Sequence, residues 1–136
     1  MSSNNTLLEV KNLEVKFSTF GGTVEAVRQI SFSVGHGETL AIVGESGCGK
    51  SVTVQSIMGL LASPPARINA DRVRLFEKDI LHQKKINGKE IRGNEVGMIF
   101  QDPMSSLNPT MKIGNQVAET LIVHRGYKKS LAQARV

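Results

Sequence analysis

The sequence is poor in cysteine and in aromatic side chains, and each shortage excludes a class of protein. Its 136 residues include one cysteine, Cys48, so an internal disulfide framework is excluded and a reducing compartment is expected. Tryptophan is absent, and five phenylalanines and one tyrosine are too few for a base-stacking platform. No apolar run approaches the ~18 residues of a membrane helix, and the first residues lack the basic and apolar regions of a signal peptide. We therefore expect about one globular domain inside the cell.

Positive charge is in excess, with a net charge of +5 and an isoelectric point of about 9.6. The basic residues are scattered, however, and pair only at Lys84–Lys85 and Lys128–Lys129. We interpret them as solvated surface charge and expect no nucleic-acid partner, while weak attraction to an anionic membrane surface stays open. Three histidines lie too far apart for a local metal motif and are expected at the surface: His36, His82 and His124.

The periodicity of apolar residues predicts a sheet followed by buried strands. Apolar and polar residues alternate over Leu7–Phe17 and again over Val24–Val34, with a Gly-Gly turn between them, which predicts an antiparallel pair. Arg72–Phe76 is a further candidate strand. Thr39–Val43 and Val96–Phe100 are continuously apolar, which predicts central parallel strands buried on both faces.

Three segments have the spacing or the start signal of a helix. The first is Lys50–Ala62, with Val54, Ile57, Met58 and Leu61 at helical spacing. The second is Lys112–Gly126, with Ile113, Val117, Leu121 and His124 on one face. Ser130 and Gln133 have the spacing of a capping box and predict the start of a third helix.

A glycine-rich segment, GESGCGKS (Gly44–Ser51), separates the first apolar run from the first predicted helix. Glycines let the backbone adopt positive φ and approach an anion closely, and exposed N–H groups at a helix start form an anion nest. The pattern G-x-x-x-x-G-K-S is that of a phosphate-binding loop, in which Lys50 would reach the β- and γ-phosphates and Ser51 would ligate Mg²⁺. The alternative is a glycine-rich turn with an incidental Lys-Ser pair. The candidate nucleotide-binding residues are Gly44, Glu45, Ser46, Gly47, Cys48, Gly49, Lys50, Ser51 and Val52.

Phosphate loops serve kinases, GTPases, helicases and transport ATPases, so the loop alone does not fix the function. Ala26–Leu61, which contains GESGCGKS, and Val96–Glu119, which contains MIFQDPMSSLNP, resemble the ATP-binding subunit of ABC transporters, most closely that of oligopeptide and dipeptide importers. The resemblance covers essentially the whole chain. It implies an α/β fold, the P-loop NTPase core of an ABC ATPase, with an N-terminal antiparallel β subdomain and with ATP and Mg²⁺ as cofactors.

The resemblance also implies partners and further site residues. Gln101 matches the Q-loop glutamine, which in the family contacts Mg²⁺ and the attacking water and links the site to the transmembrane subunit. An aromatic residue usually stacks on adenine, and Phe17 is the candidate, with Phe20 as the alternative. The segment from Gln101 to Pro109 is expected to face transmembrane permease subunits. A second ATPase subunit and a peripheral location at the cytoplasmic face of the cell membrane are expected too.

Several family motifs find no match in residues 1–136: the Walker B strand with its acidic residues, the LSGGQ-type signature and the switch histidine. We therefore interpret residues 1–136 as the N-terminal part of a nucleotide-binding domain, an incomplete core that ends in the start of the helical subdomain. We expect ATP binding here, with hydrolysis coupled to peptide import in the complete subunit. The alternatives are a truncated, non-catalytic remnant that binds nucleotide or a partner without turnover, and a cytosolic ABC-type ATPase. The transported substrate stays open among oligopeptide, dipeptide, nickel and glutathione.

Overall fold

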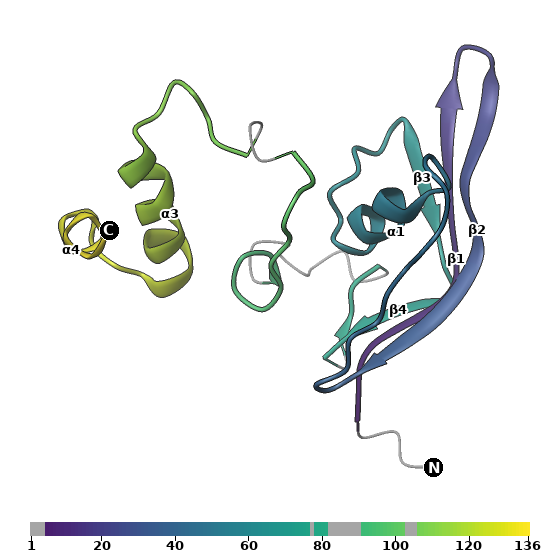
Figure 1. The fold of residues 1–136 in the computed structure, drawn as a ribbon, viewed down its shortest axis with the longest axis horizontal. Coiled ribbons are helices and arrows are strands. Elements are labelled where there is room, and N and C mark those ends of the chain that lie inside the picture. The colour runs from purple at the N-terminus through teal and green to yellow at the C-terminus, as the bar shows by residue number, and fades with distance from the viewer. Residues whose placement is uncertain (1–4, 77, 82–90, 103–105) are drawn as a thin grey trace. The chain divides into compact units, whose positions relative to one another are not determined.

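The computed structural model describes residues 5–76, 78–81, 91–102 and 106–136 of the chain (Figure 1). The chain forms two compact units, Met1–Ile86 and Asn87–Val136, and each is described here by itself. None of the helices in the described residues has the length and apolar character needed to span a bilayer. His82 and the predicted loop residue Pro103 lie outside the described residues.

The first unit is built on a five-stranded antiparallel sheet, as the alternating segments predicted. Its strands are β1 (Thr6–Thr19), β2 (Gly22–Gly35), β3 (Ala66–Asn69), β4 (Arg72–Leu75) and β5 (Lys78–Asp79). The order is β2-β1-β4-β5, and β3 also pairs with β1. The long hairpin of β1 and β2 is the largest feature of this unit (Figure 1). Leu8 pairs with Leu75, so β1 joins segments that lie far apart in the sequence.

A β-bulge at Asn12 determines which side chains of β1 face the core. Val10 pairs with Phe32 and Leu13 pairs with Ile30, so β1 advances three residues while β2 advances two. Asn12 adopts a positive φ of 49°. Because one extra residue reverses the alternation of side chains, Val10 and Leu13 lie on the same face despite their odd spacing.

Side chains from three segments stabilise this bulge. The Asn12 N–H donates to Ser31 Oγ over 2.8 Å, and Ser31 Oγ donates to Asn12 Oδ1 over 3.2 Å. Asn12 Nδ2 donates to Asp71 Oδ2 over 2.6 Å. The bulge is therefore tied both to β2 and to the turn before β4.

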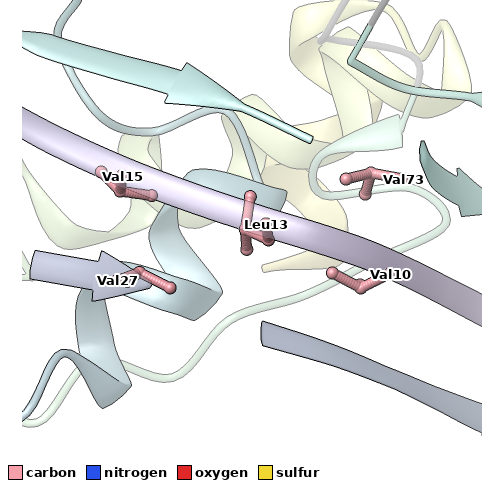
Figure 2. Close-up of a cluster of buried hydrophobic side chains, with 5 residues drawn as sticks. All are labelled: Val10, Leu13, Val15, Val27 and Val73. Carbon is pink, nitrogen blue, oxygen red and sulfur yellow. The ribbon is translucent and has the colours of Figure 1, made fainter. Parts of the chain in front are cut away.

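The core of the first unit lies on one face of the sheet. Five side chains with at most 4% of their surface exposed form it, three from β1 and one each from β2 and β4 (Figure 2): Val10, Leu13, Val15, Val27 and Val73. Burying a valine or leucine side chain contributes about 1.5–3 kcal/mol, so this cluster is the main hydrophobic stabilisation of the sheet.

Helix α1 (Lys50–Ile57) packs against this core and is shorter than the predicted Lys50–Ala62. Gly59 has a φ of 62° and ends the helix in a Schellman motif. Its N–H donates to the Ser56 carbonyl (3.1 Å), and the next N–H, that of Leu60, donates to the Gln55 carbonyl (2.9 Å). Val52 and Ile57 pack on the core, whereas Val54, which was predicted on the helix's apolar face, is exposed.

The two predicted central strands, Thr39–Val43 and Val96–Phe100, are not strands in this structure. Both segments are largely exposed: Val43 retains 87% and Ile99 98% of its surface. A buried parallel strand needs strands on both sides and helices on both faces. All strand pairs of the described sheet are antiparallel; among the described residues no strand pairs with Thr39–Val43, and Val96 forms only an isolated bridge with Arg92.

The second unit contains α3 (Ile113–Arg125) and α4 (Lys129–Arg135), which pack through Ala118 and Ala132. The helix predicted over Lys112–Gly126 is confirmed, and it ends at Gly126, which has a φ of 65°. The predicted face does not become a core, since Ile113 retains 64% and Val117 48% of its surface.

Two local predictions in this unit are wrong. The third predicted helix is confirmed as α4, but no side chain caps it: its N-cap is Lys128, and Gln133 instead donates to Asn115 Oδ1 of α3 over 3.2 Å. His124 is half-buried rather than exposed, because its ring lies against Gly93, where an added Cβ would sit 2.7 Å from Nε2. His36 is exposed as expected, and no metal-binding group of three or more acidic, cysteine or histidine side chains occurs in the described residues.

We expect the stability of the sheet to depend on pH through a cross-strand ion pair. Lys16 Nζ lies 2.9 Å from Glu14 Oε1 and 3.0 Å from Glu25 Oε1. Its hydrogen bond lowers the pKa of Glu25 from 4.5, and the hydrogen bonds of Glu14 and Glu25 raise the pKa of Lys16 from 10.5. The stabilisation that ionised Glu25 contributes to the fold is therefore complete above pH 4.5 and is lost as the pH falls below it. The stabilisation that protonated Lys16 contributes is complete below pH 10.5 and is lost as the pH rises above it.

Urea denaturation at several pH values checks this expectation. The difference in unfolding free energy between the wild type and Glu25→Gln should be largest near neutral pH and shrink towards pH 3. Glu119→Gln is the control, because Glu119 is exposed and makes none of the ion pairs seen in the described residues. A Glu25→Gln difference that stays constant with pH would contradict the assignment.

Candidate functional site

The glycine-rich segment lies at the start of α1 and is open to solvent. After β2 the chain returns as an extended segment to the beginning of this helix (Figure 1). Gly44–Cys48 and Ser51 are exposed, while Gly49 and Lys50 are half-buried. The segment therefore presents backbone and polar groups, as the absence of core-forming side chains suggested.

Two glycines of the loop have positive φ for different reasons. Gly49 has a φ of 92°, and a Cβ there would overlap the carbonyl oxygen of Ala26 in β2. Gly47 has a φ of 81°, but a Cβ there would meet no atom within 4 Å. Gly49 is thus required for close packing of the loop on β2, and Gly47 only for the backbone conformation. Ala26 was missed in the sequence because its contribution is a backbone carbonyl, which any residue carries.

The N-terminus of α1 is left without a cap. Its N-cap is Gly49, no side chain caps the first N–H groups, and no acidic residue lies in the first turn. The first N–H groups of a helix have no acceptor within the helix, and the helix dipole places partial positive charge at this end. These donors are therefore available to an anion.

Lys50 places its ammonium group inside the loop. Nζ donates to the carbonyl of Gly44 over 2.7 Å and to the carbonyl of Glu45 over 2.6 Å. The Cys48 sulfur lies 3.5 Å from the same nitrogen. An ammonium has three N–H donors, so two hold the loop closed and the third faces only a weak acceptor. This third donor is the one that a stronger acceptor would take.

These residues fit the phosphates of a nucleotide with its divalent cation. The loop supplies unpaired backbone donors and an ammonium group for phosphate oxygens, and Ser51 supplies an exposed hydroxyl oxygen, a ligand suited to Mg²⁺. Val52 packs its side chain on the core, so only its backbone N–H is left for a ligand. The roles of Glu45, Ser46 and the remaining loop residues in binding stay predictions.

The remaining candidate residues lie on other elements. Phe17 is half-buried in β1 and packs against the core cluster, whereas Phe20 is fully exposed in the turn between β1 and β2. Gln101 belongs to the second unit, in an exposed bend after Phe100. Its place in a Mg²⁺ site rests on the resemblance and stays a prediction.

Comparison with known proteins gives one family and a group of similar chains. The family model described as ABC transporter matches residues 27–135. The dipeptide transport ATP-binding protein DppD of Bacillus subtilis is 52% identical over 96% of this chain, and the one of Lactococcus lactis is 51% identical over 95%. The oligopeptide transport ATP-binding protein OppD of Bacillus subtilis is 50% identical over 95% of this chain. The chain covers only 39%, 37% and 36% of the length of these three proteins, respectively.

Proposed function

Because the chain belongs to the ABC transporter family, we propose that residues 1–136 are the N-terminal part of a nucleotide-binding domain and bind ATP at Gly44–Val52. The observation that carries this proposal is the pairing of Lys50 with the loop carbonyls at an uncapped helix start. A glycine-rich turn without a function would not need an ammonium group held at its centre.

The chain's own groups would divide the work of binding. The ammonium of Lys50 and the first N–H groups of α1 would bind phosphate oxygens, and the Ser51 hydroxyl would ligate Mg²⁺. By the resemblance alone, Gln101 would be a further Mg²⁺ ligand and would orient water through its amide oxygen. When bound, ATP supplies the phosphoanhydride bond whose hydrolysis drives transport in the complete subunit.

For the adenine ring, the burial of the two candidates favours Phe20 over Phe17. Phe17 is half-buried and packs on the core cluster, so its ring is engaged in packing. Phe20 is fully exposed at the hairpin turn, and the loop packs on Ala26 of the same hairpin. We therefore propose that Phe20 stacks on adenine, since an exposed aromatic ring keeps its face free for a base.

The named functions of the relatives support a place in a peptide importer. Their names specify dipeptide and oligopeptide transport. By extension, this chain would act in a peripheral ATPase subunit at the cytoplasmic face of the membrane, with transmembrane permease subunits and a second ATPase subunit. The segment from Gln101 to Lys112 and the start of α3 would face the permease.

Protection of Cys48 from alkylation tests the nucleotide site. The thiol is exposed, and it is the only cysteine in the chain. We expect maleimide to label it readily in the free chain and Mg-ATP to slow the labelling, because nucleotide phosphates would cover the sulfur beside Lys50. If only the free form reacts, labelling should slow roughly tenfold at ten times the Kd.

Two controls sharpen this experiment. A Ser130→Cys chain carries a second, exposed thiol on α4, and labelling at position 130 should not respond to Mg-ATP. Phe20→Ala should weaken the protection of Cys48 by Mg-ATP but not its protection by inorganic triphosphate. Phe17→Ala removes the other candidate aromatic ring and is the matched control. Equal labelling of Cys48 with and without saturating Mg-ATP would sink the assignment of the loop.

A further inference from the structure

The turn before α3 is held by one side-chain amide, that of Gln116. Its Oε1 accepts the N–H of Asn108 over 2.8 Å. Its Nε2 donates to the carbonyl of Asn108 over 2.8 Å and to the carbonyl of Met111 over 3.0 Å. One amide thus pairs with both backbone groups of Asn108, as a neighbouring strand would, and also fixes the end of the turn.

The same turn is also closed from within. Asn108 Oδ1 accepts the N–H of Thr110 over 3.0 Å and its hydroxyl over 2.7 Å. The N–H of Met111 donates to the Asn108 carbonyl over 3.2 Å. Gln116 adds the only side-chain link seen, among the described residues, between this turn and the body of α3. Without it, the turn would keep its shape locally but lose its fixed orientation on the helix.

The ordered turn presents apolar side chains that it does not bury. Leu107 retains 48% of its surface, Met111 42%, and Ile113, at the start of α3, 64%. Holding such side chains in one arrangement lowers the ordering cost of binding, which is the effect of preorganisation.

We propose that Gln116 is a positioning residue that fixes the turn Asn108–Met111 on α3, and so holds Leu107 and Met111 in the arrangement that the permease contacts. That the partner is a permease subunit rests on the proposed function. The effect of Gln116 on the turn does not, because it follows from the three hydrogen bonds of its amide. The two parts can therefore be tested separately.

Amide hydrogen exchange in the full chain tests the first part. Gln116→Leu keeps the approximate size of the side chain and removes all three bonds, so exchange at the Asn108 amide should accelerate roughly 2- to 10-fold, as expected for one lost hydrogen bond. Gln116→Glu keeps an acceptor and should retain most of the protection at Asn108. Gln133→Leu is the matched control, because Gln133 bonds α4 to Asn115 and leaves the turn untouched. Unchanged Asn108 exchange in Gln116→Leu would overturn the inference.

Photo-crosslinking in the complete transporter tests the second part. A photoreactive amino acid in place of Leu107 should crosslink to a permease subunit, and Gln116→Leu should reduce the yield severalfold while Gln133→Leu does not. Protection of Cys48 by Mg-ATP should persist in both variants, which separates positioning from a general loss of structure. A crosslink that survives Gln116→Leu at full yield would overturn the inference and leave the proposed function standing. No crosslink in the otherwise wild-type complex would overturn the proposed partner and the positioning of a permease contact, while the ordering of the turn by Gln116 is decided by the exchange experiment alone.

Discussion

Replacing Lys50 by alanine is expected to lower the affinity for Mg-ATP by roughly 10- to 150-fold, the effect of losing a hydrogen bond between charged groups worth about 1.5–3 kcal/mol. The variant removes the donor for phosphate. It also removes the two bonds from Nζ to the carbonyls of Gly44 and Glu45, so the loop loses its internal tie. Both effects act in the same direction, and the upper part of the range is therefore expected. Isothermal titration with Mg-ATP measures the change.

A matched loss of charge shows whether the effect is local. Lys128→Ala removes the same charge at an exposed position, the N-cap of α4 in the other unit. It should leave the affinity within about twofold of the wild type, because Lys128 lies outside the loop and salt screens an exposed, solvated charge. If Lys50→Ala bound Mg-ATP as tightly as Lys128→Ala, the phosphate-loop assignment would be wrong.

Gly49→Ala is expected to be the most damaging change of a single methyl group. The backbone of Gly49 has a φ of 92°, which costs a residue with a side chain about 1–3 kcal/mol. The new Cβ would also overlap the Ala26 carbonyl, and relieving such overpacking costs about 1–3 kcal/mol more. Urea denaturation should therefore show a loss of about 2–6 kcal/mol, accompanied by weaker nucleotide binding.

Gly47→Ala separates strain from overlap. Gly47 has a similar φ of 81°, but the space around its Cβ position is open. This variant should lose only about 1–3 kcal/mol, the cost of the backbone conformation. The difference between the two variants measures the contact with Ala26. If they were equally destabilised, the loop would not pack on β2 as described.

Alternation of apolar and polar residues was sufficient to predict the β1–β2 hairpin, and helical spacing was sufficient for α3. Both signals are local, because they depend on which face of one element is apolar. The phosphate-loop prediction is local in the same sense, because the glycines, the lysine and the serine of its pattern lie within eight residues. The structure adds what each glycine does, which depends on where β2 lies.

Other features depend on neighbours that no local pattern specifies. The apolar run Thr39–Val43 has the composition of a buried strand, but pairing requires partner strands, and none of the strands in the described part of its unit pairs with it. Gln133 has the spacing of a capping residue, yet its amide finds Asn115 on another helix. Gln116 escaped notice for the same reason, since a glutamine in a helix is ordinarily a solvated residue.

The pairing of β1 with β4 has a consequence for the order in which the first unit folds. The β1–β2 hairpin can form from local contacts, but Leu8 meets Leu75 only after the intervening chain has been arranged. Contacts between residues so distant in sequence are slow to form, since the entropy of closing the loop is lost before the contact stabilises it. The phosphate loop and α1 both lie inside this closure. On a ribosome, the proposed nucleotide site would therefore mature late, after β4 has emerged and joined the sheet.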